Sequence, residues 1–150
     1  MKTGKKPYQN IQDTMNKLRN QILDSYDYAF ENTPYFENPD KLFYWLKLRT
    51  TYKKDPVGVE LLQEMRTMFE NNRYGYPGYG DCDCMTIATV ACMAVNNWPG
   101  KQIIIVGNDK SKPQHIYAGV FWEGVPYTLD LTNPYINMER KYKYKQILTV

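Results

Sequence analysis

The sequence has 150 residues, a formal net charge of +3 and 43% hydrophobic residues, values typical of one globular domain with a core of its own. We therefore expect a single domain over residues 1–150, with residues 1–8 as a flexible basic tail. Three cysteines are an odd number for a short chain, which argues against a disulfide framework and favours a reducing compartment. No apolar run is long enough for a signal peptide or a membrane span, so we expect a soluble, cytoplasmic protein without a membrane partner.

Tyrosine is unusually frequent, with 14 residues in an aromatic content of 15%. Such a number suits a protein that contacts other proteins, or a cleft lined by amphipathic rings. A small core that uses tyrosine as filler explains it equally well.

The N-terminal half predicts helices. Apolar residues at helical spacing predict a first helix over 9–31, which Asn32-Thr33-Pro34 ends. Asn38-Pro39 predicts the start of a second helix that runs through Leu48. Asp55-Pro56 predicts the start of a third, because proline is favoured in the first helical turn. This third helix is expected to reach about Asn71 and to turn these residues inward: Val59, Leu62, Met65 and Phe69.

The stretch from Gly78 to Val95 carries the first chemical signal. Tyr74 to Gly80 is rich in glycine and tyrosine and is expected to be irregular, so that its backbone can approach a substrate while Tyr76 and Tyr79 line a cleft. Asp81 is a good N-cap for the helix that follows. Cys82 then lies in the first helical turn, where the helix dipole favours a thiolate.

The same helix separates Cys82 from the other cysteines. At 100° per residue, one apolar stripe includes Cys84, and Cys82 lies on the opposite side. Cys92 lies at the flank of the stripe. Buried cysteines are commonly inert, so Cys84 and Cys92 are expected to be core residues and Cys82 a candidate nucleophile.

The C-terminal half predicts an antiparallel sheet. Strands are expected over 102–106, 115–122 and 126–131, with a tight turn at Glu123-Gly124. Folding at that turn brings Asp130 beside His115, the single histidine of the chain. We expect the polar segment 107–113 to form a flexible lip before His115. The region 144–150 predicts a last strand.

Lysines alternate with tyrosines close to that last strand, at Lys141, Lys143 and Lys145. Nucleic-acid binding would require a larger basic surface and a recognisable module, and neither is present. Lysines also protect an edge strand from pairing with other chains, and we favour this interpretation.

A thiol, an imidazole and a carboxylate can perform acyl transfer together. The imidazole of His115 would take the proton of Cys82 and later protonate the leaving group, while Asp130 would fix the tautomer. Two alternatives remain open. The histidine could be structural, or Cys82, Cys84, Cys92 and His115 could hold zinc, although Cys-x-Cys within one helix is poor spacing for a tetrahedral site. We expect no metal and no cofactor.

These motifs resemble a known family. Gly80-Asp81-Cys82-Asp83, then an apolar helix, His115 on a strand, and Leu129-Asp130-Leu131-Thr132 resemble the transglutaminase-like cysteine protease superfamily, in particular its small bacterial and phage branch. The segment 52–63 resembles the one that precedes the cysteine loop in such proteins, and the resemblance covers about residues 42–135. The family often has aspartate where Cys84 stands, and Asp-Pro-Thr where this chain has Asp130-Leu131-Thr132.

The resemblance implies an α+β fold with a transglutaminase-like or papain-like core, in which N-terminal helices and the cysteine helix pack on a small antiparallel sheet. It also implies that Cys82, His115 and Asp130 form the triad of a cysteine peptidase or amidohydrolase acting on a protein or peptide. The backbone N–H of Cys82 is the natural first oxyanion donor, with Tyr76 or Tyr79 as candidates for the second. Two other functions remain: a structural or assembly component of a phage particle or other complex, located in the host cytoplasm or the virion, or transfer of the acyl group to an amine.

Overall fold

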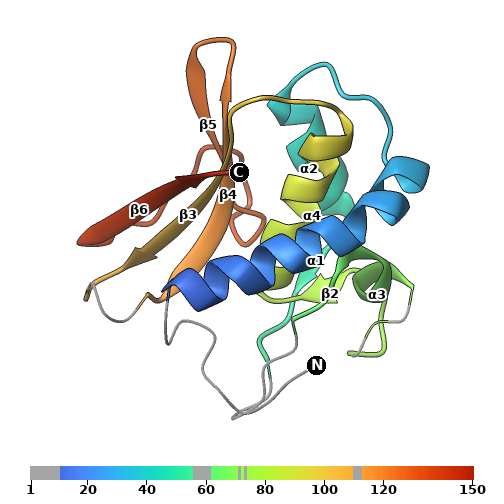
Figure 1. The fold of residues 1–150 in the computed structure, drawn as a ribbon, viewed down its shortest axis with the longest axis horizontal. Helices are drawn as coiled ribbons and strands as arrows, with labels where there is room; N and C mark the ends of the chain where they lie inside the picture. Colours follow the sequence, from blue (N-terminus) through green and yellow to red (C-terminus); the bar gives the residue numbers. More distant parts are fainter. Residues whose placement is uncertain (1–10, 56–61, 71, 73, 110–112) are drawn as a thin grey trace.

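The computed structural model describes residues 11–55, 62–70, 72, 74–109 and 113–150. The expected tail at 1–8 lies outside these residues. The fold is α+β, with the main helices on one side of a small antiparallel sheet (Figure 1). The elements, in chain order, are α1 (Ile11–Asn32), α2 (Pro39–Arg49), β1 (Thr51–Tyr52), α3 (Met65–Phe69), β2 (Tyr79–Gly80), α4 (Cys82–Val95), β3 (Lys101–Gly107), β4 (His115–Trp122), β5 (Val125–Leu129) and β6 (Tyr144–Thr149).

The helix α4 occupies the centre of the fold. It packs against β3 and β4 on one side and against α1 on the other. All its residues from Asp83 to Met93 are buried. The predicted single apolar stripe is therefore wrong, because both sides of the helix are covered. Cys92, expected at the flank of that stripe and in the core, is fully buried.

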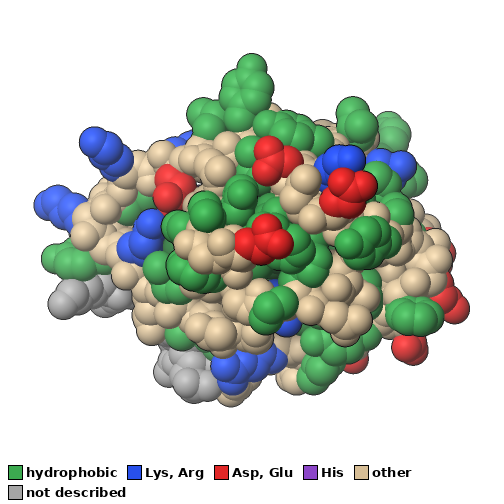
Figure 2. Space-filling view, turned by 90° about the horizontal axis from the view of Figure 1, so that it is seen from above, with side chains coloured by type: hydrophobic (Ala, Val, Ile, Leu, Met, Phe, Trp, Pro, Cys, Tyr) green, Lys and Arg blue, Asp and Glu red, His purple; other side chains and the backbone are tan. Residues whose placement is uncertain are grey.

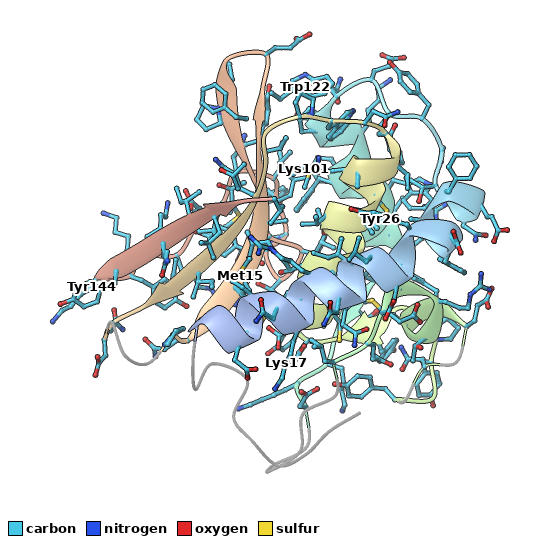
Figure 3. The ribbon with its side chains drawn as sticks, viewed as in Figure 1. Met15, Lys17, Tyr26, Lys101, Trp122 and Tyr144 are labelled. Atoms are coloured by element: carbon cyan, nitrogen blue, oxygen red, sulfur yellow. The ribbon has the colours of Figure 1, made fainter. Side chains whose placement is uncertain are left out.

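The first two predicted helices are present in the structure as α1 and α2. Figure 3 shows Met15 pointing from α1 toward the rest of the molecule, and Lys17 on the opposite side, where it pairs with Asp13 at 3.3 Å. Asn38 is the N-cap of α2, since its Oδ1 accepts a hydrogen bond from the backbone N–H of Lys41 at 3.0 Å.

The third predicted helix is much shorter than expected. Residues 56–61 and 71 of its predicted range, with Val59, lie outside the described residues, and 62–64 are not helical. The helix α3 begins only after Glu64, whose carboxylate caps it by accepting the backbone N–H of Thr67. Just before that cap, the buried side chain of Gln63 donates to the carbonyl oxygen of Tyr79 at 3.1 Å and fixes the chain there.

The segment 74–80 is partly regular, which corrects the prediction of an entirely irregular loop. Gly75 and Gly78 have positive φ, as turns require. Tyr79 and Gly80 then form β2, which pairs in parallel with β1. The signal was missed because each strand has two residues, too few to show alternation. This short ladder leads the chain directly into Asp81 and the start of α4.

The main sheet has the strand order β5-β4-β3-β6, and each pair of adjacent strands is antiparallel. Ile116, Ala118 and Val120 of β4 face the main core, while Tyr117 lies on the other face with Ile104 and Val106. The edge position predicted for the last strand is confirmed, although only Lys145 of the three lysines lies within β6. No helix among the described residues is long and apolar enough to cross a membrane.

Candidate active site

The side chain of Cys82 is placed by the first turn of α4. Asp81, the N-cap, accepts hydrogen bonds through Oδ1 from the backbone N–H groups of Asp83 and Cys84, at 3.2 and 3.5 Å. The predicted cap is thus confirmed. The side chain of Cys82 is partly exposed, and its Sγ lies 3.8 Å from Oδ1 of Asp83. A thiol at this position meets the positive end of the helix dipole.

The other two cysteines are core residues, as the sequence predicts. Cys84 and Cys92 are both fully buried. Burial raises the pKa of Cys84 well above its usual range, and nearby Asp81 adds to the effect. Burial also raises the pKa of Cys92 to about 12, although a contact with the hydroxyl of Thr33 at 3.4 Å opposes the shift. Neither thiol is therefore suited to act as a nucleophile at neutral pH.

His115 and Asp130 meet because of a tight hairpin between β4 and β5. Glu123 and Gly124 both have positive φ, as a type I′ turn requires. The register that follows pairs Trp122 with Val125. Asp130 directly follows β5, and its Oδ2 lies 2.7 Å from Nε2 of His115 at the start of β4. The juxtaposition expected from the turn is therefore present, although the strand ends at Leu129 rather than at residue 131.

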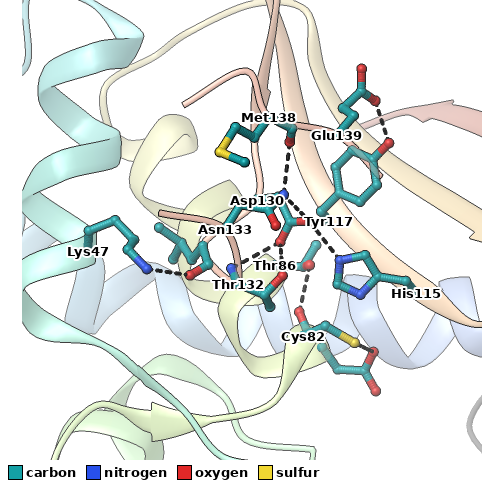
Figure 4. A network of polar contacts seen from close by, with 12 residues as sticks. Lys47, Cys82, Thr86, His115, Tyr117, Asp130, Thr132, Asn133, Met138 and Glu139 are labelled. Atoms are coloured by element: carbon teal, nitrogen blue, oxygen red, sulfur yellow. Dashed lines mark hydrogen bonds and ion pairs between the residues drawn. The ribbon is translucent and has the colours of Figure 1, made fainter. Parts of the chain in front are cut away.

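Packing of α4 against β4 brings Cys82 to the same end of the fold as His115. Cys82 is the first residue of α4 and His115 the first of β4. In the close-up of Figure 4, the ring nitrogen of His115 that is not bonded to Asp130 is on the side that faces Cys82. The ring is mostly enclosed, with 13% of its side chain exposed. Figure 2 shows the molecule from above the view of Figure 1, and no histidine is visible on that face.

The carboxylate of Asp130 is held in one orientation by its neighbours. Its Oδ1 accepts hydrogen bonds from the backbone N–H of Thr132 at 3.0 Å and from the Thr132 hydroxyl at 2.7 Å. Its Oδ2 accepts a hydrogen bond from Nδ2 of Asn133 at 3.2 Å, besides the contact with His115. Burial alone would raise the pKa of Asp130, but the bonds from His115 and Thr132 outweigh it, so the pKa lies below its usual range. The carboxylate is therefore ionised at neutral pH.

Sequence reasoning missed Thr132 and Asn133. It treated residues up to 131 as strand, although the run Asp-Leu-Thr-Asn contains side chains that commonly bond to a nearby backbone in turns. That composition was the available signal. The fold converts it into a turn that surrounds the carboxylate of Asp130.

Asp81, the residue directly before Cys82, is perturbed by neighbouring acidic groups. Burial raises the pKa of Asp81, and the charges of Asp83 and Asp55 add to this effect. The hydroxyl of Tyr74 donates a hydrogen bond to Asp55. The raised pKa means that Asp81 keeps its proton more readily than an ordinary carboxyl group.

Tyr76 and Tyr79, the candidates for a second oxyanion donor, lie against one another, with ring centroids 5.2 Å apart. Tyr76 is largely exposed. Tyr79 uses its carbonyl oxygen to accept hydrogen bonds from Gln63 and Asn72. Among the hydrogen bonds that the described residues make around the site, none comes from either hydroxyl.

The zinc alternative has no geometric support in the described part of the chain. No group of three His, Cys, Asp or Glu side chains there is arranged to hold a metal ion.

Comparison of the chain with protein-family models, curated proteins and solved structures gives no match. The function must therefore be argued from the site itself.

Proposed function

We propose that this protein catalyses thiol-dependent acyl transfer, and that the reaction is hydrolysis of a peptide or amide bond. The observation that carries the proposal is the 2.7 Å contact between His115 Nε2 and Asp130 Oδ2, at the start of strand β4, which packs against the helix that begins at Cys82. A histidine with a purely structural role does not need a buried carboxylate whose second oxygen is held by other donors. A histidine that acts as a base does need one, because it must present a fixed nitrogen to the nucleophile.

The steps follow from the positions of the three side chains. Nδ1 of His115 takes the proton of the Cys82 thiol as Sγ attacks the substrate carbonyl carbon. The imidazolium then gives this proton to the leaving nitrogen as the C–N bond breaks, which leaves a thioester on Cys82. Water attacks the thioester, its proton passes to His115, and the acid is released as the proton returns to Sγ. Asp130 stabilises the imidazolium in both halves of the reaction.

The developing oxyanion needs donors near Cys82. The backbone N–H of Cys82 lies at the first position of α4, before the first backbone hydrogen bond of the helix, which joins Met85 N–H to Asp81 O at 3.1 Å. Such N–H groups at a helix start point toward the region where the carbonyl oxygen would lie. We assign this group as the first oxyanion donor.

The arrangement also supports the family suggested by the sequence. A nucleophile at the start of a central helix, with histidine at the start of one strand and aspartate directly after the antiparallel strand beside it, is what a transglutaminase-like or papain-like core would require. We accordingly propose membership of the transglutaminase-like superfamily as the origin of the site.

The proposal is tested by turnover of activated acyl donors, such as short peptide thioesters and p-nitroanilides, by four proteins. Wild type and Cys92→Ala should release product, because Cys92 is buried away from the reaction. Cys82→Ala and His115→Gln should be inactive. Addition of a small primary amine then separates hydrolysis from amine transfer: unchanged release of the acid supports hydrolysis, and capture as an amide supports the transglutaminase reaction.

A second function, a structural part of a larger assembly, is favoured by the exposure of large apolar side chains such as Phe30, Tyr35 and Leu48. In that case Cys82→Ala would leave every process that the protein supports unchanged. Loss of a process in Cys82→Ala, with folding retained, would exclude a purely structural role.

A further inference from the structure

The loop between β5 and β6 contacts two neighbouring side chains of β4. Asp130 starts this segment and bonds His115, as described above. Glu139 lies near its other end, and its Oε2 accepts a hydrogen bond from the hydroxyl of Tyr117 at 2.5 Å. His115 and Tyr117 lie on the same face of the strand, with ring centroids 5.5 Å apart. The segment 130–139 therefore holds both rings at once, one with each carboxylate (Figure 4).

Asn133 joins the two ends of this segment. Its side chain, in a residue only 4% exposed, donates from Nδ2 to Asp130 Oδ2 at 3.2 Å and to the carbonyl oxygen of Met138 at 2.9 Å. Met138 directly precedes Glu139. The side-chain amide has two N–H donors, so both can be satisfied within the segment.

Two further residues restrict the carboxylate of Asp130 and the segment that carries it. Thr132 bonds Oδ1 through its backbone N–H and its hydroxyl. Lys47 of α2 donates from Nζ to the carbonyl oxygen of Leu131 at 3.0 Å, which ties the segment to the helical layer. The orientation of the carboxylate thus depends on two residues. Thr132 donates to Oδ1, and Asn133 donates to Oδ2, the oxygen that also contacts His115.

We propose that Asn133 is a positioning residue of the site: by holding Oδ2 of Asp130 toward His115, it keeps the proton of the neutral imidazole on Nε2 and presents an unprotonated Nδ1 to Cys82. The benefit to Cys82 rests on the proposed function. The choice of tautomer follows from the hydrogen bonds of the segment alone. Without the amide of Asn133, Thr132 still holds Oδ1 but Oδ2 loses the donor that fixes its position, so the carboxylate can turn about Oδ1 and the ring is no longer restricted to one tautomer.

The single histidine makes the tautomer directly observable, because all imidazole ¹⁵N signals come from His115. The spectra are recorded over a pH series, to find the neutral ring, for wild type, Asn133→Leu and the matched control Asn137→Gly. Asn137 lies in the same segment and accepts the backbone N–H of Thr128 through its side chain. Its φ of 65° suits glycine, so the control alters the segment without touching Asp130.

Wild type and Asn137→Gly are expected to show a protonated Nε2 and a bare Nδ1. Asn133→Leu is expected to show a mixture of tautomers and about tenfold slower alkylation of Cys82, as the loss of one hydrogen bond to a carboxylate implies. A single Nε2–H tautomer in a folded Asn133→Leu protein would overturn the proposal.

If Asn133→Leu does not fold, Asn133→Ser provides the second test, because it keeps a small polar side chain but lacks the amide that donates to Oδ2 of Asp130. It should give mixed tautomers. A single Nε2–H tautomer in a folded Asn133→Ser protein would overturn the proposal. Wild type with the expected tautomer but an unreactive Cys82 would support the role of Asn133 while contradicting the proposed function.

Discussion

Replacing Asp130 by asparagine is the sharpest perturbation of the site. The carboxylate accepts hydrogen bonds on both oxygens, from His115 and Asn133 on Oδ2 and from Thr132 on Oδ1. An asparagine amide has one oxygen, so its NH₂ group must face a donor on one of the two sides. The negative charge that would stabilise an imidazolium is also lost. Asp130→Asn is therefore expected to weaken the control of His115 without changing the fold.

The size of the effect follows from the bond to His115. A hydrogen bond to a charged group contributes about 1.5–3 kcal/mol, and about 1.4 kcal/mol corresponds to a tenfold change in rate. In a serine enzyme the loss of the aspartate lowers turnover by about 10⁴-fold. A thiolate and an imidazolium stabilise each other, so the dependence should be weaker here. We expect a loss of about 10- to 1000-fold in acyl transfer.

Asp130→Asn should also change how stability depends on pH. The pKa of Asp130 is lower in the folded state than in the unfolded chain, so the unfolded state binds more protons. The contribution of Asp130 is thus fully present above about pH 4, and it is lost as the pH falls through the folded-state pKa. Urea unfolding over pH 2–7, beside turnover of an acyl donor, should show a shallower acid dependence for the variant. A variant with undiminished turnover, or with an acid dependence as steep as that of wild type, would refute this account.

Three further predictions concern the cysteines and the turn before them. Iodoacetamide at neutral pH, followed by peptide mapping, should label Cys82 much faster than Cys84 or Cys92, because the latter two are buried with raised pKa values; equal rates in the folded protein would exclude Cys82 as the nucleophile. Cys84→Ala should keep activity, lose about 1 kcal/mol of unfolding free energy or a little more, and contain no stoichiometric metal; one zinc per wild-type chain, lost in this variant, would instead support a structural zinc site. Gly78→Ala should be strongly destabilising in thermal unfolding, because Gly78 has a φ of 82° and the new Cβ would overlap the carbonyl oxygen of Arg49. Gly75→Ala, at a similar φ but in open space, should lower the unfolding free energy by only about 1 kcal/mol. Equal effects of the two substitutions would contradict the close approach of Gly78 to Arg49.

Much of the site could be predicted because its signals are local. An aspartate before an apolar helical run specifies a cap, and Glu123-Gly124 between two alternating segments specifies a hairpin with Asp130 opposite the start of β4. Both follow from short stretches of sequence. The positions of Cys82 and His115 at the starts of their own elements could therefore be derived before the fold was known, whereas Asp130 lies directly after its strand and not within it.

The parts that could not be predicted depend on distant contacts. Cys92 and Asp83 are buried because α1 and the sheet cover both sides of α4, and no periodicity within the helix shows this. The ladder between β1 and β2 joins segments far apart in sequence through two residues each. The role of Thr132 and Asn133 depends on a carboxylate whose orientation is set only in the folded turn.

The central claim is that Cys82 forms a covalent acyl intermediate, and the mass of the intact protein tests it most directly. Wild type mixed with an activated peptide thioester and quenched in acid should gain the mass of one acyl group, and digestion should locate that group on Cys82. Cys92→Ala should behave in the same way, whereas Cys82→Ala should gain no mass. An acyl group on another residue, or turnover that survives in Cys82→Ala, would contradict the account.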